Sequence, residues 1–248
     1  MLRCSIIIPT LNEEGCIGQT LDNLAQLQPP PLEVIVIDGG STDGTQAAIA
    51  QRMECCSIPI KRLAHLPGRA VQMNAGANAA SGEALCFLHA DTWIPPDAMA
   101  LIAHTLRKGD VAGGGFISLM QGPTVTRWGT SLHNYLKTFY APLLFRPHLF
   151  ARGLRLLFGD QVIFCRTEAF WACGGFDPAM PIMEDGDLCC RLVQQGRIRL
   201  VNRVVHSSDR RVAKWGPLRA NLIFLMIGFL WGVGVPTPWL KRFYEDVR

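Results

Sequence analysis

The sequence predicts an α/β fold with a mostly parallel central sheet flanked by helices. Three apolar runs of four or five residues, at 5–9, 34–37 and 84–88, are rich in β-branched and aliphatic side chains. Each run ends at a polar, turn-forming phrase, which is typical of strands buried on both faces of a parallel sheet. Helical patterns separate the runs, and this alternation indicates βαβ units.

Periodicity and turn residues predict the other elements. Ile17, Leu21 and Leu24 repeat at helical spacing within 15–27, and the prolines at 29–31 end that helix. Further helices are expected at 43–53, 69–80, 97–108 and 184–195, and further strands at 58–63, 161–166 and 198–205.

The alternation changes after the glycines at 113–115. Residues 121–159 contain no acidic residue, five basic residues and many aromatic ones. We interpret this stretch as a helical aromatic insertion. A basic segment from Arg210 and an apolar run at 222–235 then form a C-terminal apolar helical tail.

Composition excludes several classes of protein. The 248 residues are 49% hydrophobic and 18% charged, which excludes disorder. The net charge of +4 includes no basic tract, so nucleic acid is not an expected partner. Nine cysteines without a CxxC motif favour reduced thiols in a cytoplasmic protein. Because a strand begins within the first five residues, no secretory signal is expected.

Ligands of open α/β sheets bind beyond the carboxyl ends of the strands, where this chain has polar phrases. The first is Asp38-Gly39-Gly40-Ser41-Thr42-Asp43-Gly44-Thr45. Turn formation and helix capping explain it as well as function does. Thr45 stands where a P-loop requires lysine, and no GxGxxG follows the first strand.

The second phrase is His89-Ala90-Asp91. A hard divalent cation on a diphosphate needs only one or two protein oxygens, and Asp91 can supply one. The alternative is that Asp91 caps a helix and His89 faces solvent.

The third phrase, Met183-Glu184-Asp185-Gly186-Asp187-Leu188, holds three carboxylates in four residues. Acids in a first helical turn are commonly explained by the helix dipole. Three are more than a cap requires, and one can accept a proton from an attacking hydroxyl.

Together these phrases resemble family 2 glycosyltransferases of the GT-A (Rossmann-like) fold, over about residues 4 to 206. The resemblance rests on Pro9-Thr10-Leu11-Asn12-Glu13, the 37–45 phrase, Gly68-Arg69 with Asn74-Ala75-Gly76, His89-Ala90-Asp91, Gly174-Gly175-Phe176 and Glu184-Asp185-Gly186-Asp187-Leu188. Leu88-His89-Ala90-Asp91-Thr92 and Ser207-Ser208-Asp209-Arg210-Arg211 are similar to a compact bacterial subgroup.

The resemblance implies a role for each matching residue. Asp185 matches the family's catalytic base, with Glu184 beside it, and Asp91 matches the last acid of the Asp-x-Asp metal motif. The residues implied for nucleotide binding are Pro9, Leu11, Glu13, Asp38, Arg69, Asn74, Arg210 and Arg211. One departure is that His89 replaces the first acid of the motif. Imidazole suits Mn²⁺ better than Mg²⁺, so His89 is either a metal ligand or a hydrogen-bond donor to phosphate.

The implied activity is inverting transfer of a sugar from a nucleotide-diphosphate sugar to an acceptor hydroxyl, with Mn²⁺ or Mg²⁺ as cofactor and a UDP-sugar as the favoured donor. The alternatives are a nucleotidyltransferase of similar fold and a non-catalytic nucleotide-sugar-binding protein. We expect a glycosyltransferase domain at 1–209, with a nucleotide-binding half at 1–110 and an acceptor half at 111–209, followed by the tail at 210–248.

The tail suggests contact with a membrane. The apolar run at 222–235 has fourteen uncharged residues, short of the roughly 20 needed to span a bilayer. A core helix is one interpretation. Basic residues before the run, together with Trp231 and Trp239, favour peripheral contact with the cytoplasmic membrane face, and with it a hydrophobic or lipid-linked acceptor.

Overall fold

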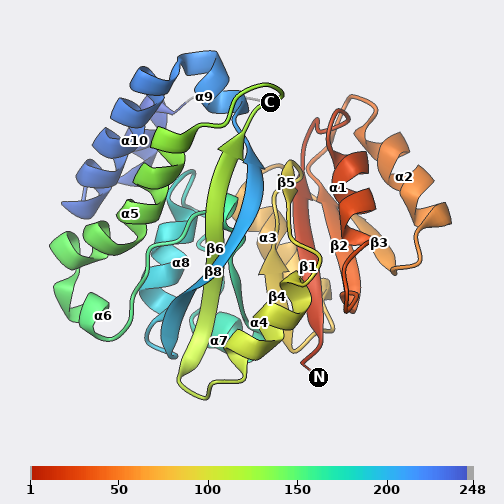
Figure 1. The fold of residues 1–248 in the computed structure, drawn as a ribbon, viewed down its shortest axis with the longest axis horizontal. Helices are drawn as coiled ribbons and strands as arrows, with labels where there is room; N and C mark the ends of the chain where they lie inside the picture. Colours follow the sequence, from red (N-terminus) through yellow and green to blue (C-terminus); the bar gives the residue numbers. More distant parts are fainter. Residues whose placement is uncertain (1, 245–248) are drawn as a thin grey trace.

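The computed structural model describes residues 2–244 and consists of helices on both faces of one eight-stranded sheet (Figure 1). The strand order is β3-β2-β1-β4-β7-β6-β8-β5. The strands are β1 Cys4–Thr10, β2 Glu33–Asp38, β3 Ile60–Ala64, β4 Ala84–Phe87, β5 Thr92–Trp93, β6 Val111–Gln121, β7 Phe164–Arg166 and β8 Arg197–Ser208.

The sheet is mixed, with a parallel half and a half that contains antiparallel strands. β1 pairs in parallel with both β2 and β4, β2 pairs in parallel with β3, and β6 pairs in parallel with β8. The short β7 is antiparallel to β4 and β6, and β5 is antiparallel to β8. The predicted α/β fold with a mostly parallel sheet is confirmed.

Two apolar layers hold the helices to the sheet. On one face, α1 and α4 pack on the side chains of Ile6, Ile8 and Val36, all of them fully buried. On the other face, α3, α7 and α8 pack on Ile7, Ile35 and neighbouring residues. The helices are α1 Ile17–Leu24, α2 Thr45–Cys55, α3 Arg69–Ala79, α4 Ala98–Leu106, α5 Trp128–Phe145, α6 Pro147–Ala151, α7 Thr167–Ala172, α8 Glu184–Leu192, α9 Arg210–Trp215, α10 Pro217–Gly232 and α11 Thr237–Leu240.

The long strand β6 lies where the sequence showed only that the alternation of strands and helices changes. Its glycines 113–115 have low strand propensity and resemble a turn. They occur in the strand because neighbouring backbone comes very close: a Cβ at Gly113 would lie 2.7 Å from the Phe164 carbonyl oxygen. A Cβ at Gly115 would lie 3.0 Å from the Gln161 carbonyl oxygen.

The C-terminal tail packs on the domain as helices. In Figure 1, α10 and the insertion helix α5 lie side by side at one edge of the molecule, and the two helices are in contact. Ile227 of α10 is buried with Ile182 and Leu240. No helix within residues 2–244 is long and apolar enough to cross a membrane.

Candidate active site

A cavity of about 570 Å³ lies beyond the carboxyl ends of β1 and β4 and is bounded by α5, α8 and α10. It contains ten of the twelve predicted site residues, namely Pro9, Leu11, Glu13, Arg69, His89, Asp91, Glu184, Asp185, Arg210 and Arg211. Strand alternation and the convergence of strand ends therefore bring together residues as distant in the chain as Pro9 and Arg211.

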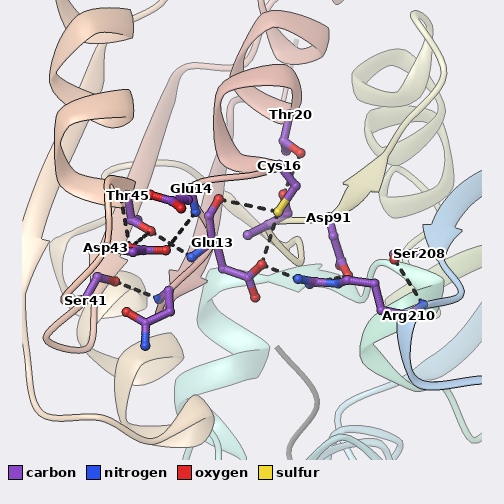
Figure 2. A network of polar contacts seen from close by, with 12 residues as sticks. Glu13, Glu14, Cys16, Thr20, Ser41, Asp43, Thr45, Asp91, Ser208 and Arg210 are labelled. Atoms are coloured by element: carbon purple, nitrogen blue, oxygen red, sulfur yellow. Dashed lines mark hydrogen bonds and ion pairs between the residues drawn. The ribbon is translucent and has the colours of Figure 1, made fainter. Parts of the chain in front are cut away.

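The loop that follows β1 is held in place by hydrogen bonds to the segment that follows β2. The Glu13 amide donates to Thr45 Oγ1 at 2.7 Å, and the Glu14 amide donates to Asp43 Oδ2 at 3.2 Å (Figure 2). In return, the Gly44 amide donates to Glu14 Oε2 at 2.6 Å. These bonds fix the backbone from which the Glu13 side chain enters the cavity.

One guanidinium joins two carboxylates in the cavity. Arg210 Nη2 lies 2.7 Å from Asp91 Oδ2 and 2.9 Å from Glu13 Oε2 (Figure 2). Burial raises the pKa of Glu13 above its usual value. Burial alone would lower the pKa of Arg210, but the charges of Asp91 and Glu13 raise it, so the guanidinium stays charged between the two carboxyl groups.

His89 interacts with an arginine. Its Nε2 lies 3.2 Å from Arg69 Nη1. Burial, and to a lesser extent the charge of Arg69, lowers the pKa of His89 to about 4. The ring is therefore neutral at pH 7. Because arginine can only donate, Nε2 accepts and the ring proton is on Nδ1. Gly159 packs so closely on this ring that a Cβ there would overlap it.

Asp185 lines the same cavity from the first turn of α8. Its side chain is 5% exposed, and its Oδ2 accepts a hydrogen bond of 2.9 Å from the Gly159 amide. Burial and the adjacent Glu184 charge raise the pKa of Asp185 to about 7. Glu184 is committed elsewhere, since its Oε1 lies 2.6 Å from Arg69 Nε. Asp185 is therefore the better placed of the two to exchange a proton near neutral pH.

Two predicted site residues are outside the cavity lining. Asp38 is 2% exposed and accepts hydrogen bonds from the Ser41 amide, the Ser41 hydroxyl and Gln46 Nε2. Asn74 joins α3 to the loop before α8, since it donates to the Phe176 carbonyl and accepts from the Phe176 amide. Both side chains are engaged within the protein, and their predicted contacts with the donor stay predictions.

Several lining residues were not predicted from the sequence, including Gln72, Lys137, Asp160 and Tyr244. Gln72 Nε2 donates to the carbonyls of Thr10 and Ile37 and so ties the ends of β1 and β2 together. The acid-free, aromatic composition of 121–159 was the only signal that pointed to Lys137.

The cavity fits a hard divalent cation at the Asp91–Glu13 pair. Within residues 2–244 no group of three His, Cys, Asp or Glu side chains converges as a closed metal site. Two carboxylate oxygens do converge on the Arg210 nitrogen, and Mg²⁺ and Mn²⁺ on diphosphates use one or two carboxylates with phosphate and water oxygens. His89 fits less well, because its Nε2 lone pair faces Arg69.

The fold and site define a cavity at the carboxyl ends of the strands, lined by a carboxylate pair that shares Arg210 and by the buried carboxylate of Asp185. Residues 5–171 match the model of glycosyl transferase family 2. The chain belongs to this family, and the family resemblance predicted from the sequence is confirmed.

Known proteins similar to this chain fall in the same class. An uncharacterized glycosyltransferase of Escherichia coli K12, YaiP, is 28% identical over 96% of this chain and 66% of its own length. The mannosyltransferase PcManGT of Pyrobaculum calidifontis, solved with GDP-Man and Mn²⁺, aligns with a TM-score of 0.70 at 21% identity over 98% of this chain and 68% of that one.

A third similar protein is the glucosyl-3-phosphoglycerate synthase of Mycobacterium tuberculosis, solved with Mn²⁺, UDP and phosphoglyceric acid. It aligns with a TM-score of 0.63 at 22% identity, over 95% of this chain and 80% of that one. At these identities the two solved structures show the fold alone.

Proposed function

We propose that the protein is an inverting glycosyltransferase that moves a sugar from a nucleotide-diphosphate sugar to an acceptor hydroxyl. The observation that carries this proposal is that one cavity is lined both by Asp185, whose pKa is about 7, and by Asp91 and Glu13, which converge on Arg210. A single displacement needs a base and a stabilised leaving group: Asp185 can supply the base, while Asp91 and Glu13 can hold the positive groups that stabilise the leaving diphosphate.

In the proposed reaction the acceptor hydroxyl gives its proton to Asp185 as its oxygen forms a bond to the anomeric carbon. The bond from that carbon to the diphosphate oxygen breaks, and its electron pair stays on the nucleoside diphosphate. Arg210, freed from its two carboxylates, donates to the leaving diphosphate, and Arg211 lines the same cavity. The residues implied for donor binding lie mostly in 1–110.

A bound Mn²⁺ or Mg²⁺ would supply positive charge at the diphosphate, and Asp91 with Glu13 would hold it. The side chains of Asp91 and Glu13 are only 21% and 15% exposed. Solvent therefore screens their charges less than it screens the charges of surface acids.

A nucleotidyltransferase is disfavoured because it would need a glycine- and lysine- or arginine-rich loop after the first strand. Thr10-Leu11-Asn12-Glu13-Glu14 is acidic at this position.

A non-catalytic sugar-nucleotide-binding protein would have no use for a buried carboxylate with a raised pKa, which is costly to ionise.

A panel of nucleotide sugars tests the proposal. Melting temperature is measured with UDP- and GDP-sugars, with and without Mn²⁺, and release of nucleoside diphosphate is followed for each donor that stabilises. A donor at a hundred times its dissociation constant adds about 2.7 kcal/mol of stability. Stabilisation without turnover under any condition would support the non-catalytic alternative.

We further propose that α5 and α10 place the protein on an anionic membrane surface. Along α10, Leu218, Leu222, Leu225 and Phe229 form an exposed stripe at helical spacing, each at least 50% exposed. On α5, Trp128, Leu132, Leu136, Leu143 and Leu144 are also exposed. No acidic residue occurs in 128–145 or 210–244, so nothing in these segments would repel anionic lipid.

Flotation with anionic liposomes at low salt tests the membrane proposal. The parent should float, and a variant with Leu222, Leu225 and Phe229 changed to serine should partition at least ~10-fold less, since each buried apolar side chain contributes on the order of 1 kcal/mol. Met53→Ser removes an exposed apolar group from α2 and should float like the parent. A parent protein that stays in the soluble fraction would overturn the proposal.

A further inference from the structure

Lys137 is a partly buried ammonium group in the wall of the active-site cavity. It projects from α5, and its Nζ lies 3.9 Å from the centre of the Phe158 ring and donates to Asn134 Oδ1 at 3.3 Å. Within residues 2–244 it forms no ion pair, although an ammonium group can donate three hydrogen bonds.

Lys137 is connected to Asp185 through the segment 158–160. Phe158 and Asp160 flank Gly159, whose amide holds the Asp185 carboxylate at 2.9 Å. Asp160 Oδ2 accepts from Asn134 Nδ2 at 2.9 Å, so the residue that binds Lys137 also fixes this segment. A group bound by Lys137 would therefore lie on the side of the proposed base.

The other cations of the cavity have different partners. Arg69 is paired with Glu184, and Arg210 is paired with Asp91 and Glu13. Arg211 and Lys241 lie against the Tyr244 ring, at 4.3 and 5.6 Å from its centre. Lys137 is the cation that reaches the cavity from α5.

We propose that the acceptor carries an anionic group, a carboxylate or a phosphate, and that Lys137 binds this group while the acceptor hydroxyl faces Asp185. The inference rests on the proposed glycosyl transfer and adds the chemical class of the acceptor. A hydrogen bond from the ammonium to an anionic group is assisted by charge on both partners, and it is therefore stronger than one to a neutral hydroxyl.

The electrostatics of Lys137 agree with this geometry. Burial lowers the pKa of Lys137 to about 8, and the charge of Asp160 only partly opposes the shift. The side chain is therefore still mainly charged at pH 7, in a place where its charge is poorly compensated. A bound anion would stabilise the charged form.

Binding of inorganic sulfate tests the proposal without a known acceptor. The protein is first saturated with Mn²⁺ and whichever of UDP or GDP stabilises it more, so that the diphosphate position is filled. Sulfate is then titrated at constant ionic strength against sodium chloride, and the melting temperature is followed. The parent should show saturable stabilisation, and Lys137→Met should weaken the apparent affinity by about 10- to 100-fold.

Two variants complete the test. Lys137→Arg keeps the charge and should retain most of the sulfate response, and the exposed Lys108→Met should respond like the parent. Because sulfate stabilises proteins generally, only the difference between these variants and Lys137→Met supports the proposal. Equal responses in all four proteins would overturn it. Failure of UDP and GDP to bind would instead count against the proposed function itself.

Discussion

Asp185→Asn should reduce sugar transfer and donor hydrolysis by about 10²- to 10⁴-fold while leaving donor binding unchanged. The substitution removes the proposed base, yet the asparagine Oδ1 can still accept the Gly159 amide hydrogen bond. Titration calorimetry with the nucleoside diphosphate and initial rates of its release separate the two effects. Asp187→Asn is the matched control, because Asp187 lies in the same helical turn but pairs with Arg191 outside the cavity.

The same variant should be more stable than the parent above pH 7. Folding raises the pKa of Asp185 from 3.8 to about 7, so the folded state resists ionisation that the unfolded chain undergoes freely. The destabilisation begins as pH rises through 4 and is complete above pH 7, with an upper limit of roughly 4 kcal/mol. Melting temperatures should therefore differ at pH 8 and converge near pH 4. A variant less stable than the parent at pH 8 would contradict the assigned burial.

Asp91→Asn should weaken Mn²⁺-dependent binding of the nucleoside diphosphate by at least ~10- to 100-fold, the loss typical even of outer-shell changes at metal sites. The asparagine keeps the shape but removes one of the two carboxylates that meet Arg210. Calorimetry with and without Mn²⁺ measures the difference. Asp97→Asn, at an exposed pair with Arg203, should bind as the parent does. Equal Mn²⁺ dependence in Asp91→Asn and the parent would remove Asp91 from the cation site.

The parallel half of the fold was predictable because its strands are buried on both faces. Every residue of β2 is buried, and its residues 34–37 form a continuous apolar run between Glu33 and Asp38. β6 was not predictable in the same way. Its glycines at 113–115 are required because neighbouring backbone comes very close, and only the assembled sheet shows this approach.

The same distinction applies to the site residues: some could be predicted from local sequence patterns, and others depend on how the chain packs. Asp91, Glu13 and Asp185 follow strand ends or begin a helix, and such positions can be identified from local patterns. The sequence could not show that Asn74 is bound to the Phe176 backbone, 102 positions away. Nor could it show that Lys137 lies beside the segment that holds Asp185, because that proximity depends on how α5 packs against the rest of the domain.

The central claim is a single displacement with Asp185 as base and no covalent sugar–protein intermediate. The most direct measurement is the configuration of the sugar that the parent protein first releases when water takes the place of the acceptor. Proton NMR of the anomeric signals, recorded before the free sugar equilibrates, gives this configuration for a donor with an α-linked sugar. We expect the β anomer to appear first. Initial release of the α anomer would contradict the account.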